Sequence, residues 1–130
     1  MSAPLAPLRT GWTTSFAQDA SGAVWFGYET PIKVSRWVDG QLTVYSKQDG
    51  LAAGKYGAHD NKVASTANGT IWYANTAGCG PFDGKRFQTI DPAGGEGGHL
   101  ARAGDGGMWA KRGNRLVRHH PDGSQETVAD

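Results

Sequence analysis

The chain has 130 residues, with 13 Lys and Arg against 12 Asp and Glu, a formal net charge of +1. This balance gives no electrostatic reason to expect nucleic-acid or anionic-membrane partners. No apolar run approaches the roughly 18 residues of a membrane span, and the opening MSAPLAPLRT lacks the apolar stretch of a signal peptide. A single cysteine, Cys79, excludes an internal disulfide framework. We expect a soluble, cytoplasmic protein of one domain.

Three segments of the chain repeat one pattern: an apolar residue followed by Ala, then Gly five positions after the Ala, then Trp three positions after the Gly. The matching sets are Phe16, Ala17, Gly22 and Trp25; Val63, Ala64, Gly69 and Trp72; and Leu100, Ala101, Gly106 and Trp109. Each copy then reaches an Asp-Gly pair, at 39–40, 83–84 and 122–123. Such a register of anchors indicates a structural repeat.

In chain order, each copy predicts four short antiparallel strands. The first copy gives 16–18, the strand around Trp25, 33–38 and 41–46. The second gives 63–65, the strand around Trp72, 79–82 and 85–90. The third gives 100–102, the strand around Trp109, 115–120 and 124–128. Residues 47–56 could host a helical turn, but Gly50 and Gly54 disfavour it.

Four-stranded units whose anchor glycines are 47 and 37 residues apart (22 to 69 and 69 to 106) are typical of β-propeller blades. We therefore predict an all-β fold with an N-terminal arm at 1–11 and three blades in 12–130, at about 12–49, 59–91 and 96–130. The alanines should lie near the propeller axis, where space is limited. The tryptophans should fill the wedges between blades.

The stretch at 19–27, D-x-x-G-x-x-W-F-G, resembles the propeller repeats of two-component sensor proteins, and residues 50–72 resemble the linker between their blades. Residues 115–130 look more like gluconolactonase and senescence-marker propellers, or streptogramin lyases. The resemblance implies a ring of about six or seven blades, whereas this chain has three. We expect a homodimer that completes a six-bladed β-propeller, with the Pro-flanked arm crossing to the partner. The alternative is a fragment of a longer propeller.

Residues just before the first strand of a blade line the mouth of the propeller channel. Ten positions before the anchor glycines stand Trp12, His59 and Glu96, and seven before stand Ser15, Lys62 and His99. The loops between second and third strands should add Glu29, Asn75, Lys111, Arg112 and Asn114 to the same face, and Asp60 and Asn61 follow His59. These positions differ between copies while the scaffold repeats, as a ligand site would need.

The chemistry of these side chains suggests three roles, with a solvated polar channel lining as the alternative. The catalytic candidates are His59, His99 and Glu96, because histidine and carboxylate serve as general acids and bases. The candidate ligand-binding residues are Trp12, Ser15, Lys62 and Asn75. The candidate metal ligands are His59, His99, Glu29 and Asp60, which suit Zn or Mn, or Ca where oxygen ligands dominate.

Other reactive side chains are expected outside this mouth. His119 and His120 precede a Pro-Asp-Gly turn and should lie on the far face. Cys79 should be a small core thiol rather than a nucleophile. The basic residues of the last copy should be solvated surface, namely Arg102, Lys111, Arg112, Arg115 and Arg118.

The sequence thus favours a small propeller hydrolase that acts on an ester, lactone or phosphotriester through a metal or histidine site in the channel. The alternatives are a ligand-binding or sensing propeller module without catalysis, and a structural propeller fragment.

Overall fold

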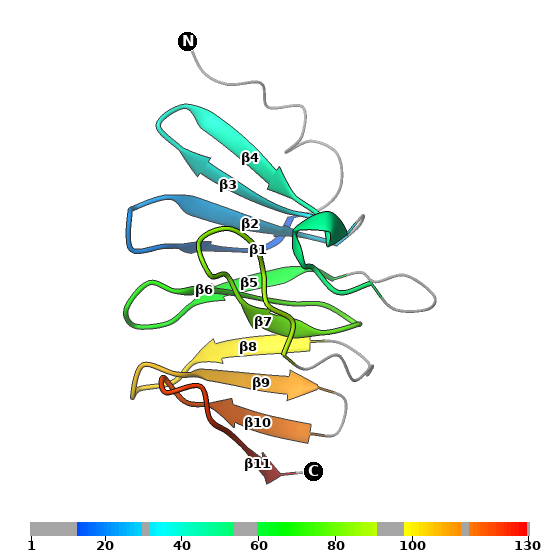
Figure 1. The fold of residues 1–130 in the computed structure, drawn as a ribbon, viewed down its shortest axis with the longest axis vertical. Coiled ribbons are helices and arrows are strands. Elements are labelled where there is room, and N and C mark those ends of the chain that lie inside the picture. The colour runs from blue at the N-terminus through cyan, green and yellow to red at the C-terminus, as the bar shows by residue number, and fades with distance from the viewer. Residues whose placement is uncertain (1–12, 30–31, 54–59, 91–97, 113–114, 130) are drawn as a thin grey trace.

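The computed structural model describes residues 13–29, 32–53, 60–90, 98–112 and 115–129. They form three antiparallel sheets stacked along the long axis of the molecule (Figure 1). Blade 1 contains β1 (Thr13–Gln18), β2 (Val24–Tyr28), β3 (Val34–Val38) and β4 (Gln41–Tyr45); blade 2 contains β5 (Lys62–Ser65), β6 (Ile71–Ala74) and β7 (Cys79–Pro81); and blade 3 contains β8 (Gly98–Arg102), β9 (Met108–Arg112), β10 (Arg115–His119) and β11 (Gln125–Ala129). The predicted all-β class and repeated sheets are confirmed.

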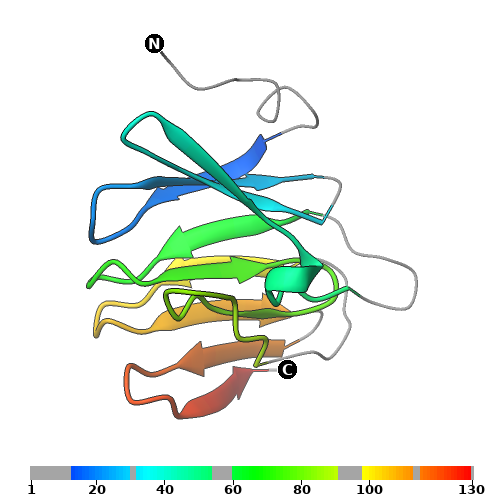
Figure 2. The same ribbon diagram turned by 45° about the horizontal axis from the view of Figure 1, so that its top comes forward.

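The first strand of each blade lies next to the first strand of its neighbour. β1 contacts β5, and β5 contacts β8, so the three sheets meet along their first strands, with blade 1 at the top, blade 2 in the middle and blade 3 at the bottom of the view (Figures 1 and 2). This convergence is what a propeller axis requires. None of the helices in the described ranges is long and apolar enough to span a membrane.

One turn recurs between the first and second strands of every blade. The anchor glycines have φ of 93°, 87° and 96° at Gly22, Gly69 and Gly106, a region in which a Cβ would be strained. Each glycine N–H donates to the carbonyl three residues earlier, on Asp19, Thr66 and Ala103, at 3.1, 2.9 and 3.2 Å. The glycine of the repeat is therefore a requirement of backbone conformation.

The tryptophan of each blade sits directly opposite the alanine of the first strand, in the pairs Ala17↔Trp25, Ala64↔Trp72 and Ala101↔Trp109. Since alternate residues of a strand point to opposite faces, both side chains lie on one face of the blade, which we call its front face. The opposite face is the back face. The small alanine leaves room for the indole ring beside the axis.

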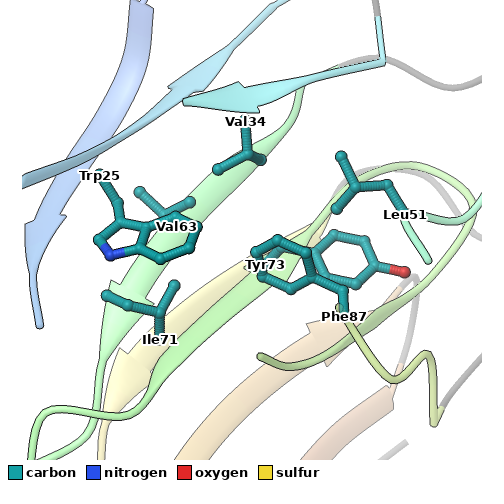
Figure 3. Packing of buried hydrophobic residues seen from close by; sticks show 7 residues of the cluster. All are labelled: Trp25, Val34, Leu51, Val63, Ile71, Tyr73 and Phe87. Carbon is teal, nitrogen blue, oxygen red and sulfur yellow. The ribbon is translucent and has the colours of Figure 1, made fainter. Parts of the chain in front are cut away.

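The front face of blade 1 packs against the back face of blade 2, and this wedge holds the main core. Trp25 is fully buried there. It clusters with Val34 of its own blade and with Val63, Ile71 and Tyr73 of blade 2 (Figure 3). Trp72, also buried, faces blade 3 and packs against the His119 ring, with 4.8 Å between ring centroids and the ring planes tilted by 44°. The prediction that tryptophans fill the wedges is confirmed for these two.

The predicted fourth strand of blade 2, at 85–90, does not form a regular strand. A Phe82↔Phe87 bridge and bonds from Gln88 N to Pro81 O and from Ile90 N to Cys79 O attach it to β7. Pro81 has no N–H to donate, which keeps β7 short. On its other side, the segment donates from Phe87 N to the carbonyl of Asp49, at 2.7 Å.

Asp49 belongs to a 3₁₀ turn, η1 (Lys47–Asp49), so the expectation that Gly50 would disfavour a helical turn here was wrong. Ser46 and Asp49 form a capping box, and Gly50 ends the turn in the left-handed conformation at φ 98°. The glycine terminates the turn instead of preventing it. The predicted arm at 1–11 lies outside the described residues.

Asp19 joins the repeated turn to the buried wedge. Its Oδ1 accepts hydrogen bonds from Ser21 and from the backbone N–H of Ala23, and its Oδ2 accepts from Trp25 Nε1 at 2.8 Å and from Arg36 Nε at 3.3 Å. Burial acts to raise the pKa of this carboxyl, but the hydrogen bonds from Ser21, Trp25 and Arg36 outweigh it and lower the pKa to about 2. The ionised Asp19 carboxylate therefore stabilises the folded state relative to the unfolded state.

We predict that Asp19→Asn lowers the free energy of unfolding by about 2 kcal/mol at pH 7. Because the folded pKa is depressed to about 2 from 3.8, this stabilisation is present above pH 4 and disappears as pH falls through 2. Urea unfolding of both proteins from pH 7 to pH 2 should show the two curves converging. Asp39→Asn, in the exposed turn between β3 and β4, is the control and should leave the wild-type profile unchanged.

Gly27 allows the closest approach between blades 1 and 2. A Cβ at this position would lie 2.1 Å from the carbonyl oxygen of Asn61. We predict that Gly27→Ala destabilises the protein by about 3 kcal/mol, since the blades must separate to accept the methyl group. Gly104→Ala is the matched control, because a Cβ there would meet nothing within 4 Å. Equal thermal midpoints for the two variants would contradict this account.

Candidate functional site

Ser15, Lys62 and His99 occupy the same position in the three first strands, each opposite the second residue after the tryptophan. Ser15 Oγ reaches blade 2 and accepts the N–H of Val63 at 2.8 Å. Lys62 reaches blade 3, with its Nζ 3.2 Å from His99 Nδ1. The structure therefore brings Lys62 and His99, predicted for binding and catalysis, into direct contact at the place predicted to be the channel mouth.

The Lys62–His99 contact defines what His99 can offer to a ligand. A lysine ammonium only donates hydrogen bonds, so His99 Nδ1 accepts and Nε2 carries the ring proton when the imidazole is neutral. The pair then presents an ammonium and an N–H donor to solvent. Both suit a carboxylate, a phosphoryl oxygen or an ester carbonyl, whereas a general base would need the lone pair that Lys62 occupies.

Two buried asparagines, Asn61 and Asn75, form a hydrogen-bond network next to Lys62. Asn61 donates from its backbone and its side chain to the carbonyl of Tyr28, at 2.7 and 3.1 Å. Asn75 Nδ2 donates to Asn61 Oδ1 and to the Ala52 carbonyl, and its Oδ1 accepts from the turn after β6, at Ala77 and Gly78. The side chain of Asn75, predicted to bind a ligand, is fully buried in this network.

Glu29 and Asp60, predicted as metal ligands, meet through their backbones. The N–H of Asp60 donates to the Glu29 carbonyl at 2.7 Å, and Asp60 has a φ of 56°. Within the described ranges, no three His, Cys, Asp or Glu side chains gather as a metal site. Trp12, His59, Glu96 and Asn114 lie outside those ranges. The metal centre therefore stays a prediction.

A hollow lies along the first strands, towards the end of the axis opposite Lys62 and His99. It has a volume of about 850 Å³ and is lined by residues of β1, β5 and β8 and their turns, including Ala17, Gln18, Ser65, Asn68, Ala101 and Arg102. Arg102 donates to the carbonyl and the hydroxyl of Ser65, at 3.0 and 2.9 Å, and so ties blade 3 to blade 2.

Arg102 was expected to be solvated surface, and it is exposed. The expectation did not include its bonds to Ser65, through which this exposed side chain joins two blades. Arg118, also expected to be solvated surface, is half-buried instead: it pairs with Asp105 at 2.8 Å and lies over the Trp109 ring at 5.1 Å.

The residues expected outside the mouth do lie elsewhere. His119 pairs with Met108 at the start of β9, whereas His99 pairs with Lys111 near its end. His120 contacts Asp105 and Glu126 at 3.5 and 3.0 Å. Cys79 is a buried thiol beside Ala74 and Ala110, as expected for a core residue.

Comparison with known proteins supports the fold but shows no specific activity. No family model matches the chain, and no curated protein matches it. A streptogramin B lyase structure matches with a TM-score of 0.65 and 13% identity over 90% of this chain and 40% of the lyase. Virginiamycin B lyase from Staphylococcus aureus matches with a TM-score of 0.65 and 12% identity over 92% of this chain and 42% of that one.

The extracellular domain of a protein assigned as a hybrid two-component system from B. thetaiotaomicron is also similar, with a TM-score of 0.67 and 19% identity over 90% of this chain and 17% of that chain. The chain thus spans less than half the length of each of these structures. It shares the blade architecture of both lyase and sensor propellers, as the sequence resemblance implied.

Proposed function

We propose that this chain forms half of a β-propeller whose channel mouth binds a small molecule through a carboxylate or an ester carbonyl, with Lys62 and His99 as the contacting residues. The observation that carries the proposal is the 3.2 Å contact between Lys62 Nζ and His99 Nδ1. It joins two blades and places two hydrogen-bond donors, the Lys62 ammonium and the His99 Nε2–H, beside each other for an oxygen-bearing ligand to approach.

The half-propeller part rests on the two end faces of the stack. Arg118 opposes Trp109 on the front face of blade 3, as Arg36 opposes Trp25 on the front face of blade 1. Each arginine lies over its tryptophan and pairs with an aspartate, Asp19 in blade 1 and Asp105 in blade 3. Asp19 is 14% exposed in the covered wedge and Asp105 is 38% exposed. Blade 3 therefore carries the elements of a blade interface.

The back face of blade 1 supplies the complementary surface. Phe16 and Phe26 stand opposite each other there, in the register that Val63 and Tyr73 hold on the back face of blade 2. Phe16 is 71% exposed, an unusual position for so large an apolar side chain. We propose that a second copy of the chain covers it, so that blade 3 of each copy packs on blade 1 of the other and six blades close the ring.

A second candidate function is hydrolysis of an ester, lactone or phosphotriester at the same mouth. The Lys62–His99 pair favours it because either donor, the Lys62 ammonium or the His99 Nε2–H, can stabilise negative charge on the carbonyl oxygen as water adds to the carbonyl carbon and the C–O bond breaks.

A metal-assisted form would use Zn, Mn or Ca held by His59, His99, Glu29 and Asp60. Lys62 opposes it, since an ammonium 3.2 Å from His99 Nδ1 repels a cation. Metal analysis of the purified protein distinguishes the two forms.

The ring predicts a mass in solution of twice the 13.8 kDa chain. Trp109→Asp and Phe16→Asp, on the two end faces, should each give a monomer in light scattering, because each places a charge in the apolar contact. Ile90→Asp alters an exposed apolar residue between blades 2 and 3 and should leave the mass unchanged. A monomeric wild-type protein would favour a fragment of a longer propeller.

Binding at the mouth is tested with δ-valerolactone and its ring-opened 5-hydroxyvalerate, followed by NMR titration. We predict that Lys62→Ala weakens binding of the carboxylate about fivefold. Lys85→Ala removes the same charge from an exposed turn of blade 2 and should leave binding unchanged.

Variants of His99 show whether this residue acts as a hydrogen-bond donor or as a general base. If it acts as a donor, His99→Gln retains more binding and more lactone opening, measured by proton release, than His99→Ala. If it is a general base, both variants lose lactone opening equally. Absence of saturable binding by either compound would reject the site.

A further inference from the structure

The two wedges inside the chain are filled differently. In the wedge between blades 1 and 2, three aromatic rings surround Trp25. Tyr45 stacks on it at 5.2 Å with an interplanar angle of 21°, and Phe82 and Phe87 meet it edge-on at 4.9 and 5.8 Å. No part of Trp25 remains exposed.

The sheet register identifies the residues that hold these positions in the wedge between blades 2 and 3. Pro81 opposes Trp72 as Arg118 opposes Trp109, so Phe82 corresponds to His119. The Phe82↔Phe87 bridge then corresponds to the pair His119↔Gln125.

The third position follows from strand 4 of blade 1. Tyr45 pairs with Val34, which stands two residues before Arg36. In blade 2, the N–H of Ile90 donates to the carbonyl of Cys79, which stands two residues before Pro81, the counterpart of Arg36. Ile90 thus corresponds to Tyr45. The aromatic set Tyr45, Phe82 and Phe87 becomes Ile90, His119 and Gln125.

A cleft lies over Trp72, beside two of these three residues, Ile90 and His119. Its volume is about 330 Å³, and its walls include Trp72, Pro81, Ile90, His119 and Pro121. Ile90 is 42% exposed at its rim. Asn68, Thr70 and His120 add polar atoms, and His120 is held between Asp105 and Glu126. Apolar walls with a few polar groups and this volume suit a small ligand.

We propose that this cleft binds one planar, neutral heteroaromatic group of indole size, seated where Tyr45 and Phe87 cover Trp25 in the other wedge. The ring would pack against Trp72, His119 and the prolines, since aromatic rings favour stacked or edge-on partners. A ring N–H or nitrogen would meet Asn68, Thr70 or His120 at the rim. The site is separate from the channel mouth and does not rest on the function proposed there.

Indole itself is the probe, titrated into the full chain and followed by ¹H–¹⁵N NMR of the tryptophan indole groups. We expect saturable shifts centred on Trp72. Ile90→Tyr restores the residue of the filled wedge and should weaken indole binding at least tenfold while raising the thermal midpoint. Gln125→Phe, which restores the second ring, should act in the same direction. Ile90→Val keeps the cleft open and should bind indole within twofold of wild type.

Three outcomes would overturn the site: no saturable shift with indole, wild-type affinity in both Ile90→Tyr and Gln125→Phe, or shifts centred on Trp25 instead of Trp72. Lys62→Ala tests whether indole binds at the channel mouth instead of in the cleft. Unchanged indole affinity in this variant supports the separate cleft, whereas its loss would place indole at the channel mouth. Failure of δ-valerolactone to bind leaves the indole result intact, so the two proposals fail independently.

Discussion

Burial of one indole ring against the next blade is the constraint on which the rest of the structure depends. The ring of Trp25 is only partly covered by its own sheet, through Tyr45 and Val34, because its front-face neighbour on the first strand is only an alanine. The remaining cover comes from Ile71, Tyr73 and the phenylalanines of blade 2. A side chain of this size contributes roughly 2–3 kcal/mol when buried. Each blade therefore gains stability only when a neighbour is present.

The same constraint explains why the mouth can vary. Once Ala17, Gly22 and Trp25 and their counterparts fix the spacing of the first strands, the residue two positions before each alanine lies at the joint between blades whatever its side chain. At that position, the hydroxyl of Ser15 accepts a backbone N–H of blade 2, whereas the ammonium of Lys62 contacts His99 of blade 3. The chemistry of the site is thus a property of pairs of blades.

Sequence patterns predicted the fold well where the cause is local. The turn glycines need a left-handed conformation and the tryptophans follow at a fixed distance, so strands and turns could be placed from spacing alone. The fourth segment of blade 2 could not, because its geometry depends on the missing N–H of Pro81 and on bonds to Asp49, 38 residues earlier in sequence than Phe87.

The sequence predicted which positions form the candidate site, but not the contacts that their side chains make. Spacing placed Lys62 and His99 at one mouth, but their contact depends on how two blades approach. Asn75 is a polar loop residue in sequence, and nothing local distinguishes a ligand contact from the buried network that it forms with Asn61 and Ala52. Arg102 likewise gave no sign that its partner would be Ser65.

The connection between blades 1 and 2 does more than join them. Besides the bond to Asp49, the hydroxyl of Thr89 donates to the Gly50 carbonyl, and the N–H of Ala52 donates to the hydroxyl of Tyr73. The connecting segment thus acts as an extra edge of the second sheet, although it precedes that sheet in the chain. The unit that repeats in sequence and the unit that can fold are therefore offset: a cut just before β5 would leave the second sheet without hydrogen-bond partners that the first half of the chain supplies.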